Sequence, residues 1–365
     1  MDKLGVGLIG AGNISDAYVR GLAMFEGLEL LAVSDIDVER AKRKAKEHGL
    51  PKGYSPKDLL ADDEIDLAVN LTFPAVHAEV SLSALAAGKH VYSEKPLAIT
   101  REDGRRILEA ASASNLRIGC APDTFLGGGL QTCRKLLDAG AIGEPIAASA
   151  FMVGHGVETW HPNPFFFFEY GGHPLFDMGP YYFTALVHLL GPVKMVAGLT
   201  GTGIKQRTVT SGPHARKVID VAAPIHATAL LELESGLPIT TIISGEVMAS
   251  ELPRIEVYGT EGALSVPDPN TFGGPVRLKT KGSKDWQDVP LSFGYTENSR
   301  GLGAADLARG LTTGTPHRAS GELAYHVLDV MQSVQDASDQ RTFIDVKSRC
   351  EKPAPLQGLK DGALV

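Results

Sequence analysis

The sequence predicts an α/β protein with two domains, a doubly wound parallel sheet followed by an α+β domain with a large, mostly antiparallel open sheet. Three observations support this. Residues 4–121 alternate apolar strands with amphipathic helices, a glycine-rich turn follows the first strand, and beyond Pro122 the apolar pattern changes to period two. With 365 residues, the chain can build two cores. We expect domains at 1–122 and 123–350, with an extended tail to 365.

The N-terminal elements alternate regularly. Short, nearly continuous apolar runs favour parallel strands that are covered on both faces. The expected strands are 4–9, 28–34, 67–71, 90–92 and 117–120. The expected helices between and after them are 14–25, 38–48, 76–87 and 101–114.

The second half begins with a helix at 129–139, a strand at 146–153 and an aromatic, proline-rich loop at 154–172. A helix then spans about 174–190. Alternating polar and apolar residues predict the strands that follow. These strands are 193–200, 225–234, 237–245, 253–259, 262–266 and 275–280, and a helix at 320–338 closes the domain.

The composition argues against several classes of protein. Hydrophobic residues make up 43% and charged residues 21%, as in soluble globular proteins. The formal net charge of −8 disfavours nucleic acid or an anionic membrane as the partner. Cys120, Cys133 and Cys350 form no CxxC pair and indicate free thiols in a reducing compartment. With neither a secretory signal nor a membrane-length apolar stretch, we expect a cytoplasmic protein.

The glycine-rich turn predicts a dinucleotide site. Gly10, Gly12 and Ser15 give the G-x-G-x-x-S spacing between a strand and a helix. Gly10 permits the tight turn, and Gly12 lets the backbone approach a pyrophosphate. The helix start at Asn13 and Ile14 supplies free N–H donors for the phosphates. A purely structural turn is the alternative, but the context favours a Rossmann domain.

Asp35 indicates which dinucleotide binds. It lies 20 residues after Ser15, where a carboxylate can accept hydrogen bonds from the ribose hydroxyls. Such a carboxylate repels a 2′-phosphate, and Arg40 lies a turn and a half further along the next helix. We therefore predict NAD rather than NADP. A solvent-exposed aspartate without a ligand is the alternative.

The ends of the next strands add candidates, because open α/β sheets bind ligands at the carboxyl ends of their strands. Thr72 and Pro74 are placed to contact the adenosine or ribose, and His77 is either a third contact or a packing residue. Glu94 either hydrogen-bonds the ribose or holds Lys95.

Lys95 is the most informative residue of the chain. We expect burial beside a positive nicotinamide to lower its pKa toward neutrality. Lys95 would then donate a proton to, or orient, the oxygen that is interconverted. The alternative is an inconsequential ion pair with Glu94 at the surface.

Three stretches carry a resemblance to a known family: TFPAVH at 72–77, ALAAGKHV at 84–91 and EKPLA at 94–98. The sequence resembles the glucose–fructose oxidoreductase/inositol dehydrogenase (Gfo/Idh/MocA) family from residue 4 to about 345. The resemblance implies a Rossmann domain, a C-terminal domain with a large open sheet, and oxidation or reduction of sugars, inositols and related polyols with NAD or NADP. It also implies that Lys95 is catalytic.

The segment GGHPLFDMGPY at 171–181 resembles the family's helix start with the motif Asp-x-x-x-His. Asp177 matches, but Tyr181 replaces the family's proton-accepting histidine. Tyr181 acts as a base only if a cation such as Lys95 lowers its pKa. Alternatively, His173 takes over, or Tyr181 only binds substrate. We predict that Lys95, Asp177 and Tyr181 are catalytic, and that Pro180 kinks this helix.

Two further segments are candidates for substrate binding. Trp160 can stack on a sugar ring and its neighbours can bind hydroxyls, unless this aromatic loop is a packing plug or a subunit contact. The second candidate segment, residues 123–129, lies at the domain junction. The candidates are Asp123, Phe125, Trp160, His161, Asn163 and His173. We predict no metal site.

We therefore predict an NAD-dependent oxidoreductase that transfers hydride between nicotinamide and a secondary hydroxyl or carbonyl of a sugar, cyclitol or related polyol. One alternative is an NAD-dependent glycosidase that oxidises a sugar transiently and eliminates the aglycone. Another is a non-catalytic dinucleotide-binding regulator. A large open sheet favours a homodimer or homotetramer.

Overall fold

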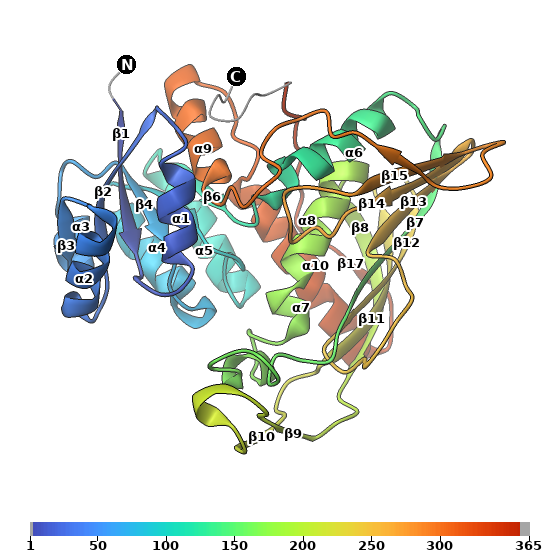
Figure 1. Ribbon diagram of the computed structural model, residues 1–365, viewed down its shortest axis with the longest axis horizontal. Helices are drawn as coiled ribbons and strands as arrows, with labels where there is room; N and C mark the ends of the chain where they lie inside the picture. Colours follow the sequence, from blue (N-terminus) through green and yellow to red (C-terminus); the bar gives the residue numbers. More distant parts are fainter. Residues whose placement is uncertain (1–2, 358–365) are drawn as a thin grey trace.

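The computed structural model describes residues 3–357 and contains two large sheets (Figure 1). The first sheet has six parallel strands in the order β3-β2-β1-β4-β5-β6, so the chain reverses its direction of winding between β1 and β4. This confirms the predicted doubly wound domain. The strands are β1 (Leu4–Ile9), β2 (Leu28–Ser34), β3 (Lys52–Tyr54), β4 (Leu67–Asn70), β5 (His90–Ser93) and β6 (Ile118–Cys120).

Local signals define the helices that connect these strands. Asp37 caps the second helix by accepting a hydrogen bond from the Arg40 N–H, and Gly49 ends it with φ 67°. The helices are α1 (Ser15–Leu22), α2 (Val38–His48), α3 (Pro56–Leu60), α4 (His77–Ala86) and α5 (Arg101–Ala113). We did not predict β3 or α3, because three and five residues are too short to give a clear period.

The second sheet has nine strands in the order β16-β15-β14-β13-β7-β12-β11-β8-β17. Its strands pair antiparallel except β7 with β12, which confirms the predicted mostly antiparallel sheet. The strands are β7 (Pro145–Val153), β8 (Val193–Gly201), β11 (His226–Leu233), β12 (Pro238–Ser244), β13 (Ile255–Gly259), β14 (Gly262–Val266), β15 (Val276–Thr280), β16 (Gln287–Val289) and β17 (Ile344–Asp345).

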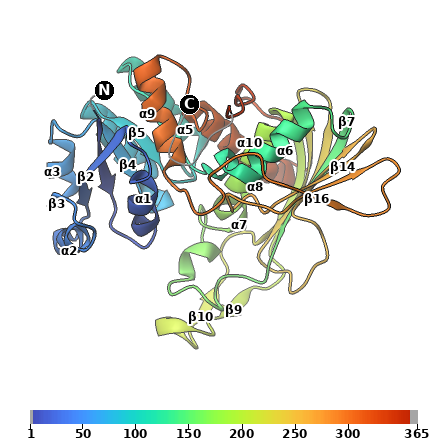
Figure 2. The same cartoon turned by 45° about the horizontal axis from the view of Figure 1, so that its top comes forward.

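A layer of helices lies between the two sheets in both views (Figures 1 and 2). It contains α6 (Gly128–Asp138), α8 (Gly179–Leu190) and α10 (Gly321–Gln340). Helix α10 packs on β8 of the second sheet, and on α5 and β6 of the N-terminal parallel-sheet domain. An additional helix, α9 (Leu302–Thr313), packs against α1, β5 and β6. Helix α9, which comes near the end of the chain, thus packs against the N-terminal parallel sheet and α1. The domain boundary at 122/123 remains a prediction.

The expected helix at 174–190 is two helices, α7 (Pro174–Asp177) and α8, with Met178 between them. Pro180 lies in the first turn of α8, where the missing N–H would have no intrahelical partner. The expectation of a kink within one continuous helix is therefore wrong. The break instead places Asp177 at the end of one helix and Tyr181 near the start of the next.

A small lobe beside the second sheet contains η3 (Phe165–Phe168) and the two-stranded sheet of β9 (Gln206–Thr208) and β10 (Val218–Asp220). Figure 2 shows this lobe as a separate projection. Phe167 and Phe168 are buried in its core. Arg207 and Glu158 form an ion pair of 2.9 Å inside the lobe, and each side chain is only 4% exposed.

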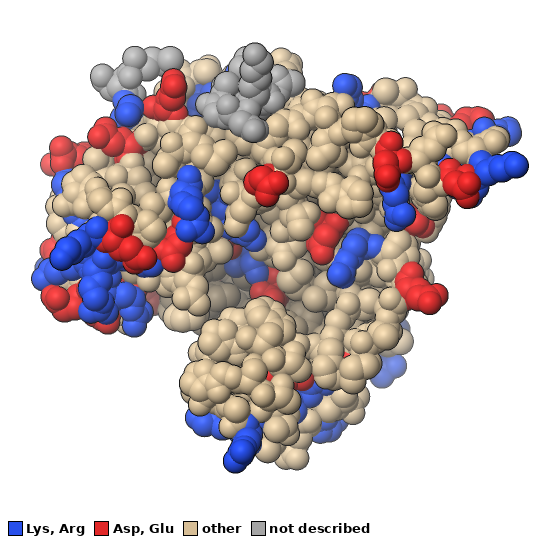
Figure 3. All heavy atoms as spheres, viewed as in Figure 1, with Lys and Arg blue, Asp and Glu red and all other residues tan. Residues whose placement is uncertain are grey.

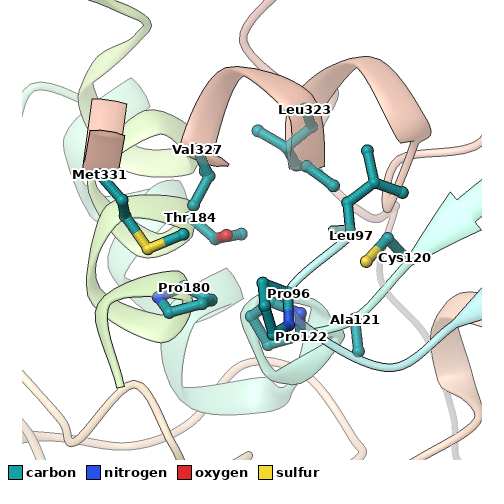
Figure 4. Close-up of a pocket in the computed structure, with 11 residues that line it drawn as sticks. Pro96, Leu97, Cys120, Ala121, Pro122, Pro180, Thr184, Leu323, Val327 and Met331 are labelled. Atoms are coloured by element: carbon teal, nitrogen blue, oxygen red, sulfur yellow. The ribbon is translucent and has the colours of Figure 1, made fainter. Parts of the chain in front are cut away.

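The turn after β5 is packed against the helical layer. A small apolar cavity of about 10 Å³ lies at this junction. Figure 4 shows Pro96 and Leu97 lining it across from Pro180 of α8 and Val327 and Met331 of α10. This packing holds the backbone of residue 95 against both parts of the molecule. Among the helices of residues 3–357, none is long and apolar enough to cross a membrane.

Candidate active site

Lys95 and Asp177 form the centre of the candidate site. Lys95 follows β5, and its Nζ donates hydrogen bonds to the Asp177 carboxylate Oδ1 and backbone oxygen, both at 2.7 Å. The two side chains are 15% and 24% exposed. Residues 82 positions apart are thus paired between the parallel sheet and the helical layer, where a ligand can reach them.

Without a bound nicotinamide, the charges around Lys95 raise its pKa and do not lower it. Burial alone lowers the pKa of this ammonium, but the charge and hydrogen bond of Asp177, with Tyr181 and Glu94, raise the pKa above its usual value. Lys95 is therefore a protonated group that donates hydrogen bonds in the cofactor-free protein, and not a neutral base.

Tyr181 lies beside this pair and is 7% exposed. The Lys95 Nζ is 5.2 Å from the centroid of its ring. Burial raises the pKa of Tyr181, and the opposing cations Lys95 and Arg300 do not reverse this shift. The hypothesis that Lys95 turns Tyr181 into a base at neutral pH is therefore not supported, and a neutral phenol that binds substrate fits better.

His173 lies outside the group around Lys95. Its side chain is fully buried, contacts the rings of Tyr170 and Phe176, and has Nε2 at 3.2 Å from Gln335 Nε2. Burial lowers the pKa of His173 to about 4. This placement does not support the alternative in which His173 replaces the family histidine.

A cavity of about 450 Å³ opens next to Lys95 and Asp177. Figure 3 shows the surface hollowed above the projecting lobe. The lining residues come from the turn after β5, the end of β7 and the 154–167 loop, α7 and α8 with Met178 between them, and three later loops. Those with polar or aromatic groups are Lys95, His155, Trp160, His161, Phe166, Phe167, Asp177, Tyr181, Asn270 and Arg300. A volume of this size accommodates a small ligand.

The predicted substrate residues divide into two groups. Trp160 and His161 line the cavity, and their rings are 5.4 Å apart. The others do not line it: Asp123 accepts the N–H groups of Gly301 and Gly303, Phe125 packs against His188, and the backbone N–H of Asn163 donates to His161. Structural hydrogen bonds or packing account for Asp123 and Phe125, and a substrate role for these two and Asn163 stays a prediction.

The glycine turn between β1 and α1 has the properties that a pyrophosphate site needs. Gly10 has φ 112°, and a Cβ there would lie 2.8 Å from the Leu71 oxygen. A Cβ on Gly12 would meet nothing within 4 Å, so its side is open to a ligand. Ile14 provides no side-chain cap to α1, which leaves N–H groups available near exposed Asn13.

We expect Gly10→Ala to destabilise the protein by about 2 kcal/mol, because alanine is strained at this φ and would collide with the chain after β4. Cofactor affinity should fall as well, since the turn must shift. The matched control is Gly27→Ala, where an added Cβ meets no atom within 4 Å. Urea denaturation and cofactor fluorescence measure both effects, and equal stability of the two variants would contradict this account.

Asp35 lies at the end of β2 beside the glycine turn. Its Oδ2 accepts the Ala11 N–H at 3.0 Å, and its Oδ1 accepts the Asp37 N–H at 2.9 Å. Arg40 Nη1 lies 3.5 Å from Asp35 Oδ2. Distance along the sequence had suggested that Arg40 is remote, but the first turn of α2 carries its side chain back to the carboxylate.

The segment after β4 is tied to the segment after β5 through His77. This buried imidazole lies 2.7 Å from the Pro96 oxygen and 2.9 Å from the Thr72 oxygen. Thr72 Oγ1 also donates to Asn70, and Pro74 begins η1 (Pro74–Val76). His77 therefore positions the Lys95 turn, in agreement with the packing alternative.

Glu94 is also used to hold this turn. It is 8% exposed, and its carboxylate accepts hydrogen bonds from the Tyr18 hydroxyl at 2.9 Å and the Lys95 N–H at 3.0 Å. The arrangement supports the reading that Glu94 holds Lys95, through its backbone.

One group of possible metal ligands occurs among residues 3–357. Asp16, Glu47 and His48 have ligand atoms within 4.8 Å of one another on α1 and α2. The Lys44 ammonium lies 2.6 Å from Asp16 Oδ1 and already neutralises this carboxylate. The group does not line the cavity.

Sequence reasoning missed Asn270 and Arg300. Both line the cavity, although they lie in loops without a recognisable motif. Arg300 is brought there by the segment that precedes α9, which packs against α1. Neither residue belongs to a sequence motif that could have identified it.

Comparisons with known proteins agree with this fold. A family model described as "Oxidoreductase family, NAD-binding Rossmann fold" matches residues 4–121, and one described as "GFO/IDH/MocA C-terminal domain" matches residues 130–265. The first model covers all six strands of the parallel sheet, and the second covers part of the nine-stranded sheet.

Three curated relatives illustrate the similarity. A 1,5-anhydro-D-fructose reductase of Ensifer adhaerens is 35% identical over 40% of this chain and 44% of that protein. Inositol 2-dehydrogenase 3 of Saccharopolyspora erythraea is 37% identical over 43% of this chain and 47% of its own. The chain thus matches less than half the length of these two. A trans-1,2-dihydrobenzene-1,2-diol dehydrogenase of Xenopus laevis is 27% identical over 81% of this chain and 84% of its own.

Solved structures share the fold. An NAD binding oxidoreductase from Klebsiella pneumoniae has a TM-score of 0.82 at 21% identity, covering 95% of this chain and 100% of that one. A levoglucosan dehydrogenase in complex with NADH and L-sorbose has a TM-score of 0.78 at 20% identity, covering 95% and 99%. At these identities the similarity establishes the architecture of both sheets.

Proposed function

The chain belongs to the Gfo/Idh/MocA family of oxidoreductases with an NAD-binding Rossmann fold, and from this premise we propose that it is an NAD-dependent dehydrogenase. It would transfer hydride between nicotinamide and a secondary hydroxyl or carbonyl of a sugar, cyclitol or related polyol. The observation that carries the proposal is the 2.7 Å pair of Lys95 and Asp177 in the wall of a cavity of about 450 Å³.

The described residues fit the cofactor. The open side of Gly12 and the uncapped start of α1 would hold the pyrophosphate, and Asp35 would accept hydrogen bonds from the ribose after its own contacts adjust. Bound NAD supplies the hydride acceptor. The strand ends at Thr72 and Lys95 would then direct the nicotinamide end toward the cavity.

In this proposal the lysine–aspartate pair handles one proton. The Lys95 ammonium donates a hydrogen bond to the substrate oxygen and orients it. In reduction, Lys95 gives a proton to the carbonyl oxygen as this oxygen receives the electron pair of the former C=O bond. In oxidation, the hydroxyl gives its proton to Lys95 Nζ as Lys95 passes one of its own protons to the Asp177 carboxylate, so Lys95 stays an ammonium and Asp177 is the group that becomes protonated.

A panel of sugars and cyclitols, screened by absorbance of reduced cofactor, tests the proposal. Net NADH formation with a free polyol supports a dehydrogenase. Release of an aglycone from a glycoside without net cofactor turnover would contradict it in favour of the glycosidase. Cofactor binding without turnover of any polyol or glycoside would favour a regulator.

The preference for NAD is a separate prediction. We expect Asp35→Ser combined with Ile36→Arg to raise the NADP/NAD ratio of kcat/KM by about tenfold or more, because the repelling carboxylate is removed and a cation is added. Ile36 is 92% exposed, so arginine fits there. Glu39→Arg on the exposed face of α2 controls for added positive charge. An unchanged ratio would place the determinant elsewhere.

We also propose a cytoplasmic homodimer or homotetramer that does not bind nucleic acid. Cys120, Cys133 and Cys350 are unpaired, as expected in a reducing compartment. Leu199 on β8 and Leu230 on β11 are more than half exposed on the second sheet, where a second copy could cover them. Light scattering of the purified protein tests the oligomeric state.

A further inference from the structure

Arg300 is a cation in the cavity without a carboxylate partner. Its Nη1 donates to Asn298 Oδ1 at 3.0 Å, and its Nη2 donates to Asn270 Oδ1 at 3.3 Å. Both acceptors are neutral amides, and the phenol of Tyr181 also interacts with this guanidinium. Within residues 3–357, no carboxylate oxygen lies within 4.0 Å of its guanidinium, although the side chain is only partly exposed.

Two acidic residues, Glu94 and Asp123, interact electrostatically with Arg300, and both already accept hydrogen bonds from other groups. Glu94 accepts hydrogen bonds from Tyr18 and the Lys95 N–H. Asp123 accepts the N–H groups of Gly301 and Gly303. Neither side chain can turn to Arg300 without leaving buried donors unsatisfied, which would cost free energy.

The remaining charges of the cavity balance each other. Its ionic lining residues are Lys95, Asp177 and Arg300, with His155 and His161 as further polar groups. Lys95 and Asp177 are paired at 2.7 Å, so Arg300 is the one ionic lining residue that has no directly paired counter-ion. The charges of Glu94 and Asp123 act on it only through space. A ligand with one negative charge could contact this guanidinium directly, and the cavity is therefore complementary to such a ligand.

We infer that the substrate is an acidic sugar, a polyol that carries one carboxylate such as a hexuronic acid, and that its carboxylate pairs with Arg300. This inference rests on the proposed dehydrogenase function. The planar guanidinium can bind both carboxylate oxygens, which fixes the orientation of the ring. Because Lys95 lines the same cavity, an acid held at Arg300 can present a ring hydroxyl to it. A phosphate ester would bring nearly two negative charges to a site with one available positive charge, that of Arg300.

Matched pairs of sugars test the inference: D-glucuronate against D-glucose, and D-galacturonate against D-galactose. We expect the wild-type protein to give a kcat/KM at least about tenfold higher for the acid of a pair. Arg300→Gln should lower the acid-to-neutral ratio by about 30-fold, mainly through KM, since the lost ion pair acts on binding. Arg309→Gln, on α9 and outside the cavity lining, is the matched control and should leave the ratio unchanged.

Calorimetric titration of the NAD-loaded protein with D-glucuronate and D-galacturonate separates this inference from the proposed function. Turnover of neutral sugars with an acid-to-neutral ratio that Arg300→Gln does not change would overturn the inference and leave the dehydrogenase intact. Arg300-dependent binding of the acids without turnover would support the carboxylate site and overturn the dehydrogenase. A loss of NAD affinity alone in Arg300→Gln would assign Arg300 to the cofactor and overturn the inference. If the acids do not bind and no sugar is turned over, both the inference and the proposed dehydrogenase function are overturned.

Discussion

Replacing Lys95 with alanine is expected to lower kcat by about 10³-fold while the affinity for NAD changes by no more than several-fold. The reason is that the ammonium would donate to the reacting oxygen, and a positioned proton donor contributes about 10²- to 10⁴-fold to rate. The substitution also leaves Asp177 without its 2.7 Å partner, so the site loses both the donor and its charge balance.

The measurement combines steady-state kinetics with cofactor binding followed by fluorescence. Lys135→Ala, on the exposed side of α6, removes an ammonium group away from the cavity and should keep wild-type kinetics. Thermal unfolding followed by circular dichroism verifies that both variants fold. If Lys95→Ala weakens NAD binding as much as it slows turnover, Lys95 is a binding residue and the catalytic assignment fails.

Substituting Asp177 with asparagine should reduce kcat by about 10²-fold and also change the pH dependence. The Asp177 charge counters burial and raises the pKa of Lys95 above its usual value. Wild-type activity should therefore not decline through loss of the Lys95 proton as pH rises to about 10. Without that charge, burial dominates and the pKa of Lys95 falls, so activity should decline at lower pH.

Profiles of kcat/KM from pH 6 to about 10 distinguish these cases. Asp220→Asn, on the exposed strand β10, changes the same functional group outside the cavity and should retain the wild-type profile. An alkaline decline at the same pH in Asp177→Asn and in the wild-type protein would show that Asp177 does not control the protonation of Lys95.

The sequence predicted the parallel sheet well because its signals are local. Strands β1 and β2 and helix α2 occupy the expected residues, since buried apolar runs and the Asp37 and Gly49 caps mark their ends. By contrast, α9 was not predicted. Its LGAADLARGLTT sequence lacks a clear polar face because the residues from 302 to 308 are all buried. Strands β9, β10 and β16 have only three residues each and gave no recognisable period.

The candidate site was predicted only in part because its assembly is tertiary. The glycine turn and the position of Lys95 at a strand end follow from local sequence, and family resemblance drew attention to Asp177. In the cofactor-free protein the pKa of Lys95 is raised, because of a carboxylate 82 residues away in the sequence, and a lower pKa beside bound nicotinamide stays a prediction. Arg300 reaches the cavity from a loop whose residues carry no motif, so only the fold reveals it.

A crystal structure of the protein with NADH and a bound polyol would test the central claim most directly. The account predicts that the Lys95 Nζ lies about 3 Å from the substrate oxygen and on the side of the cavity that faces the nicotinamide C4. A complex in which Lys95 points to bulk solvent, and another group donates to that oxygen, would contradict it.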